Sequence, residues 1–155
     1  MEVYNIKIRF DEAVNCCVSC SEENIFITSI KSAAMFQSLS VGVREVVFGN
    51  QVTIIAPCNL YECTIGDESF VGPFVEIQKG VTIGSRCKIQ SHSFICELVT
   101  IGNDCFVGHG VMFVNDLFSN GGPSGNSAGW KPTFIGNRIS IGSNATILPL
   151  SLIHI

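Results

Sequence analysis

The sequence predicts an all-β protein built as a parallel β-helix, in which short strands wind into stacked triangular coils. Large apolar residues recur at every sixth position, small residues recur two positions before them, and glycine often follows them. Six residues with one large and one small inward side chain describe a short strand and a corner. Three such units close a coil of about 18 residues.

The large residues form an unbroken column from Ile65 to Phe113, and the same step resumes at Ile135. Every member is isoleucine, valine or phenylalanine: Ile65, Val71, Ile77, Ile83, Ile89, Ile95, Ile101, Val107, Phe113, Ile135, Ile141, Ile147 and Ile153. Sandwich strands do not recur at an invariant six-residue step, so we expect this column to fill the interior of the coils. The glycines that follow it are expected at tight corners, where they supply freedom in φ.

The small column explains three of the eight cysteines. Cys63, Cys87 and Cys105 occupy its positions, where a free thiol behaves as a small apolar group. The segment Cys16–Cys20 contains one C-x-x-C pair, with neither a second pair nor histidine at zinc-finger spacing. We therefore expect reduced thiols and no metal site.

The first 45 residues follow a different pattern and are expected to form a separate cap of uncertain fold. Residues 1–10 alternate like a strand, and residues 21–39 carry apolar residues near helical spacing. A β-helix exposes unpaired backbone groups at its ends, so covering one end is the expected task of this α/β segment. The β-helix itself is predicted over residues 46–155.

A loop is predicted over residues 114–134, because the six-residue step fails there. The stretch 119–126 has the serine, asparagine, glycine and proline content of a loop. Loops of this length are usually functional or disordered. The only tryptophan, Trp130, favours docking over a neighbouring surface.

Composition excludes several classes of protein. The 155 residues suit one domain, and a net charge of −4 without a basic stripe argues against a nucleic-acid partner. No apolar stretch is long enough to cross a bilayer, and the N-terminal residues lack the apolar core of a signal peptide. We expect a cytoplasmic protein without a membrane partner.

The coil spacing by itself indicates an acidic site. Residues 18 positions apart lie on adjacent coils, separated by about 4.8 Å, so Glu97 should lie beneath Asn115. Asp116 follows, and the two carboxylates would then face each other at the mouth of the loop. Such a pair can attract an ammonium group and orient it while it loses a proton. Two exposed carboxylates on a solvated edge are the alternative.

Several segments resemble the hexapeptide-repeat acyltransferases, and among these the nucleotide-sugar amine N-acetyltransferases of bacterial polysaccharide synthesis. The segments are Gly72 to Gln78, Ile89 to Glu97, Ile101-Gly102, Gly108 to Phe113, Asn115-Asp116 and Ile141 to Pro149. The resemblance implies a left-handed coil, since handedness does not follow from the repeat. It also implies a homotrimer with active sites between subunits, which moves acetyl from acetyl-CoA to the amino group of a UDP- or dTDP-linked sugar.

The resemblance also assigns further site residues. A histidine often activates the acceptor in such enzymes, so His109 and His92 join Glu97 and Asp116 as catalytic candidates. The predicted substrate contacts are Asn115, Gln90 and Trp130. The backbone amides of Gly142, Ser143, Asn144 and Ala145 are expected to bind the acetyl-CoA arm and polarise its thioester carbonyl.

The sequence departs from the family pattern near its end. Relatives read Leu-Pro-Gly and continue with further coils, whereas here Leu148-Pro149 is followed by Leu150 and the sequence closes at Ile155. In the family coenzyme A lies along those further coils. We therefore expect an incomplete cofactor site and an exposed last coil that associates with other molecules or is covered by a neighbour.

Two other functions fit the same fold. A γ-type carbonic anhydrase needs three histidine ligands for zinc, but the spacing of His92, His109 and His154 does not resemble that arrangement. A degenerate trimer that binds nucleotide sugar without turnover is the other alternative, and the short C-terminus favours it.

Overall fold

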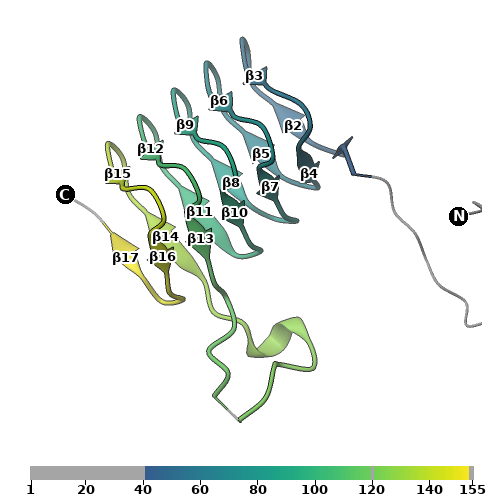
Figure 1. Ribbon diagram of the computed structural model, residues 1–155, viewed down its shortest axis with the longest axis vertical. Helices are drawn as coiled ribbons and strands as arrows, with labels where there is room; N and C mark the ends of the chain where they lie inside the picture. Colours follow the sequence, from purple (N-terminus) through teal and green to yellow (C-terminus); the bar gives the residue numbers. More distant parts are fainter. Residues whose placement is uncertain (1–40, 120, 154–155) are drawn as a thin grey trace, which may run out of the picture. The chain divides into compact units, whose positions relative to one another are not determined.

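The computed structural model describes residues 41–119 and 121–153, and these form the predicted left-handed parallel β-helix. Short strands stack into three parallel sheets, and the chain visits the three sheets in turn (Figure 1). The expected cap lies almost wholly outside the described residues, as do Cys16, Cys17, Cys20 and His154.

Sheet A contains β1 (Val43–Arg44), β4 (Asn59–Tyr61), β7 (Glu76–Ile77), β10 (Phe94–Ile95), β13 (Met112–Phe113) and β16 (Thr146–Ile147). Sheet B contains β2 (Val47–Phe48), β5 (Thr64–Ile65), β8 (Thr82–Ile83), β11 (Val99–Ile101), β14 (Thr133–Ile135) and β17 (Leu152–Ile153). Sheet C contains β3 (Thr53–Ile54), β6 (Phe70–Val71), β9 (Lys88–Ile89), β12 (Phe106–Val107) and β15 (Ser140–Ile141). The first described coil thus begins slightly before residue 46.

Strand pairing follows the predicted register. Phe94 of β10 pairs with Glu76 of β7, and Phe106 of β12 pairs with Lys88 of β9, so partners are 18 positions apart. For pairs that span the loop the separation grows to 34 positions, as between Phe106 and Ser140. The loop therefore lengthens one coil without changing how the coils stack.

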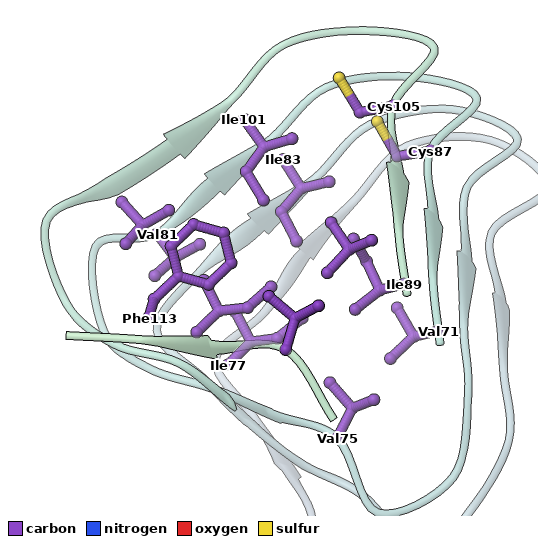
Figure 2. Close-up of a cluster of buried hydrophobic side chains, with 14 of the residues drawn as sticks. Val71, Val75, Ile77, Val81, Ile83, Cys87, Ile89, Ile101, Cys105 and Phe113 are labelled. Carbon is purple, nitrogen blue, oxygen red and sulfur yellow. The ribbon is translucent and has the colours of Figure 1, made fainter. Parts of the chain in front are cut away.

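The interior is filled by the predicted large column (Figure 2). Ile77, Ile89, Ile95 and Val107 are completely buried. Each lies against the equivalent residue of the coils below and above, because the strands pair in register. A continuous packed column thus replaces the core of a layered domain.

Polar members of the small column donate hydrogen bonds to the backbone of the next coil. The Cys87 Sγ donates to the carbonyl of Gly102 at 3.1 Å, and the Ser93 Oγ donates to that of Gly108 at 2.9 Å. Burial raises the pKa of the Cys63 thiol to about 11. The prediction of interior cysteines is confirmed for Cys63, Cys87 and Cys105, all of which are buried.

The prediction that glycine follows the large residues to supply freedom in φ is wrong. The left-handed backbone conformation falls two positions later, at residues such as Glu68, with a φ of 57°. Glycine is required at the earlier position because the coils approach closely there. A Cβ on Gly66 would lie 2.7 Å from the carbonyl carbon of Gly84, and one on Gly84 would lie 2.7 Å from that of Gly102.

The loop leaves the β-helix between β13 and β14, as predicted, and projects away from the coils (Figure 1). Its neck is closed by the backbone N–H of Lys131, which donates to the carbonyl of Asn115 at 2.8 Å. It contains one short 3₁₀ helix, η1 (Ser127–Gly129), capped by the Asn126 side chain, which accepts from the Ala128 N–H.

Within the described part of the chain, no helix is both long and apolar enough to cross a membrane.

Candidate functional site

Apart from Trp130, the predicted site residues lie at two corners on either side of sheet A. We call the turns from sheet C to sheet A, at residues 72–75, 90–93, 108–111 and 142–145, the histidine corner. We call the turns from sheet A to sheet B, at residues 78–81, 96–98 and 114–116, the acidic corner. The outward residues of sheet A, including Phe94 and Met112, lie between them.

His109 is held on two sides at the histidine corner. Its Nδ1 lies 2.9 Å from the Ser91 Oγ on the coil below. Its backbone N–H donates to the Ser143 Oγ on the coil above at 3.1 Å, and its carbonyl accepts from the Asn144 N–H at 2.8 Å. The imidazole is exposed, so it is oriented by the chain and still accessible to a substrate.

His92 lies at the same corner, one coil below His109. Its ring stacks on that of Phe74, with centroids 4.9 Å apart and planes inclined by 29°. Its backbone has a φ of 63°, and Gly110 occupies the equivalent position on the next coil. A Cβ on Gly110 would lie 2.6 Å from the Asn144 Oδ1, so glycine there leaves room for that side chain beside His109.

Glu97 and Asn115 stack at the acidic corner, as the 18-residue spacing predicts. The Asn115 Nδ2 donates to the Glu97 carbonyl at 3.3 Å. The Glu97 N–H donates to the Gln78 Oε1, also at 3.3 Å. Among the described residues no group forms a hydrogen bond or ion pair with the Glu97 carboxylate, which is half-buried. It therefore keeps its capacity to bind a cationic ligand.

Asp116 follows Asn115, but its carboxylate is engaged with the loop. Its Oδ2 accepts from the Ser124 N–H at 2.7 Å. Its Oδ1 accepts from the Phe118 N–H at 2.9 Å and from the Ser124 hydroxyl at 3.1 Å. These bonds, first those from the Ser124 and Phe118 amides, hold the pKa of Asp116 below its usual range. The carboxylate thus ties the two sides of the loop together.

The other predicted substrate contacts lie in different places. Gln90 is a half-buried residue of the histidine corner, and its N–H donates to the Val107 carbonyl at 2.9 Å. Trp130 is half-buried at the end of η1, and its N–H donates to the Ser127 carbonyl at 3.1 Å. Gln90 is therefore near the two histidines, whereas Trp130 belongs to the loop.

The four residues expected to bind acetyl-CoA lie at the histidine corner, on the coil above His109. The Asn144 N–H is already bonded to His109, and the Ala145 N–H donates to the Gly142 carbonyl at 3.4 Å. Within the described residues, the N–H groups of Gly142 and Ser143 have no backbone or side-chain acceptor. These two amides are the donors that a ligand carbonyl or phosphate can use.

Sequence reasoning missed Ser91 and Phe74, the partners of the two histidines. The 18-residue spacing that places Glu97 beneath Asn115 could have predicted both contacts, because each residue lies 18 positions before its histidine. A serine or phenylalanine carries no catalytic signal by itself. Only the spacing from a histidine marks it.

Residues 62–97 match the family model described as bacterial transferase hexapeptide (six repeats). The matched segment runs from the corner after β4 to the acidic corner, and it includes Ser91, His92 and Glu97. Together with the parallel β-helix, this match supports a hexapeptide-repeat transferase, a group in which acyltransferases are frequent.

Proposed function

We propose that this protein transfers an acetyl group from acetyl-CoA to the amino group of a nucleotide-linked amino sugar. The observation that carries the proposal is the exposed imidazole of His109, held at its ring by Ser91 and at its backbone by Ser143. The coils that precede His109, residues 62–97, match a transferase family. An oriented and accessible imidazole is the side chain best suited to removing a proton near neutral pH.

The reaction requires a general base and a hydrogen-bond donor that stabilises the oxyanion. The sugar amine attacks the thioester carbonyl, so that an N–C bond forms and the C–S bond breaks. His109 takes one N–H proton from the nitrogen and passes it to the departing thiolate. The free amides of Gly142 and Ser143, one coil above, are the proposed donors to the carbonyl oxygen as negative charge develops.

Glu97 is the proposed binding site for the sugar ammonium before it loses its proton. Among the described residues none forms a hydrogen bond or ion pair with its carboxylate, and the residue is half-buried, which strengthens its attraction for a cation. Asn115, stacked on Glu97, offers an amide for the sugar hydroxyls. Asp116 supports this site by holding the loop, and Trp130 is the loop residue proposed to cover the sugar.

The two corners flank one face of the coil. Hexapeptide-repeat β-helices commonly form trimers. We propose that a neighbouring subunit closes the cleft, bringing its histidine corner to the acidic corner of the first. The choice of a UDP- or dTDP-linked sugar is supported by the sequence resemblance described above.

The test is acetyl transfer from acetyl-CoA to UDP- and dTDP-linked amino sugars, with the acetylated product measured by mass spectrometry. We expect His109→Asn to lower kcat about 100-fold or more, because general-base catalysis contributes at least that much. Glu97→Gln should lower kcat/KM about tenfold through weaker binding of the amine. Glu68→Gln, at a corner between sheets B and C, is the matched control and should leave turnover unchanged.

If the wild type is active and both His109→Asn and Glu97→Gln keep its turnover, the assignment of the site is wrong. A rise in melting temperature with nucleotide sugar but without product would instead support the non-catalytic sugar-binding trimer.

A further inference from the structure

We propose that Ser91 is a positioning residue, whose hydroxyl selects the tautomer of His109 that carries its proton on Nδ1. The inference deepens the proposed function and rests on it for the role of His109 as the base. The hydrogen bond itself is independent of that role, because it is a property of the folded chain.

The geometry brings Ser91 to His109 through the coil repeat. The two residues are 18 positions apart and occupy the same position of the histidine corner on adjacent coils. The Gly110 N–H donates to the Ser91 carbonyl at 3.0 Å, which fixes the backbones on either side of the side-chain contact. Ser143 holds the His109 backbone from above, so the backbone that carries the ring is bonded to both neighbouring coils.

The chemistry requires one arrangement of the proton. When Nδ1–H donates to the Ser91 Oγ, the lone pair of Nε2 is free to accept a proton from the amine. If Ser91 donated to Nδ1 instead, Nε2 would carry the hydrogen and could not act as a base. After protonation, Nδ1–H still donates to the same oxygen, so the Ser91 contact survives the whole proton transfer.

A hydroxyl also differs from the carboxylate that orients many catalytic histidines. It carries no charge, so it orients the ring through a hydrogen bond alone. Ser91 acts through His109 and needs no contact with the substrate.

The experiment is ¹⁵N NMR of the full chain with selectively labelled histidine, which gives signals from three histidines only. His109→Asn identifies the His109 signals by their loss. In the neutral wild-type ring we expect Nδ1 to appear as the N–H nitrogen and Nε2 as the bare one. Ser91→Ala should move the ring towards the Nε2–H tautomer that free histidine prefers, and Ser91→Thr should restore the wild-type spectrum.

Kinetics supply the second readout. Ser91→Ala should lower kcat about tenfold with KM changed less than about twofold, and Ser91→Thr should recover most of the loss. The matched control is Ser85→Ala, since Ser85 holds the same repeat position at another corner and its hydroxyl has no ring partner. It should change neither the spectrum nor kcat.

The outcomes separate the two proposals. An Nδ1–H wild-type ring that Ser91→Ala alters, in a protein without acetyl transfer, would overturn the proposed function and keep the assignment of the tautomer. A wild-type ring with its hydrogen on Nε2, or a spectrum and kcat that Ser91→Ala leaves unchanged, would overturn the role of Ser91.

Discussion

At the scale of single residues, the coil imposes demands that differ by position in the repeat. Gly84 lies directly against the backbone of Gly102, so any side chain there meets atoms that cannot move aside. Two positions further on, Arg86 accepts a left-handed backbone and forms an ion pair of 2.7 Å with Asp104. Glycine is thus selected by close approach, and the strained corner residue is held by the stacked strands.

Gly84→Ala should lower the free energy of unfolding by about 1–3 kcal/mol, because overpacking against backbone is not relieved by a rotamer change. Gly142→Ala is the matched control, since it occupies the same repeat position on the last described coil and its Cβ would meet no atom within 4 Å. Chemical denaturation of both variants measures the difference. Equal losses of stability would contradict the close-approach explanation.

At the scale of elements, the loop between β13 and β14 is organised by a carboxylate. Asp116 bonds to Phe118 and Ser124, which lie on opposite sides of the loop, while Lys131 closes the neck on Asn115. A side chain predicted to be catalytic therefore has a structural task visible in its contacts. Under the proposed function, Asp116 would act on substrate binding through the position of the loop.

The order of the loop should depend on pH in the acid range. Hydrogen bonds from the loop lower the pKa of Asp116, so its ionised carboxylate stabilises the loop. This stabilisation is fully present above the ordinary pKa of 3.8 and is lost as pH falls through the lowered pKa. The amide signals of Phe118 and Ser124 in ¹H–¹⁵N spectra should report this loss.

Asp116→Asn should remove that pH dependence, since the amide does not titrate. Asp104→Asn, which changes an acidic residue of another corner, should leave both amide signals as in the wild type. If the Phe118 and Ser124 signals of Asp116→Asn still change with pH as they do in the wild type, Asp116 does not cause the pH dependence of the loop.

At the scale of the whole molecule, the coils of the described chain contact only their neighbours, and apolar side chains remain on the outside. Leu148, Leu150 and Leu152 on the last described coil are each more than half exposed, as is Phe118 in the loop. Apolar surface of this kind is typical of interfaces. It agrees with the proposal that the site is completed between subunits.

Sedimentation equilibrium should therefore give a mass of about 50 kDa, three times the 16.7 kDa of one chain. Loss of the trimer on dilution should lower the specific activity in parallel, because each site needs a neighbouring subunit. A species of one chain mass with full activity would contradict the shared site.

The repeat period by itself determined the β-helix, its interior column and the stacking of residues 18 positions apart. That stacking was sufficient to place Glu97 beneath Asn115 and to bring the two histidines to adjacent coils, since it depends only on backbone spacing. Sequence also located the loop, because the period fails there.

Only the tertiary structure decided what each side chain contacts. Ser91 bonds to His109 and Asp116 turns into the loop because side-chain torsions and the path of an irregular segment set these contacts, and a six-residue period encodes neither. The same holds for Gly66, whose role depends on how closely two coils approach. Backbone stacking is periodic and therefore readable in the sequence, whereas the direction of an individual polar group is a local result of packing.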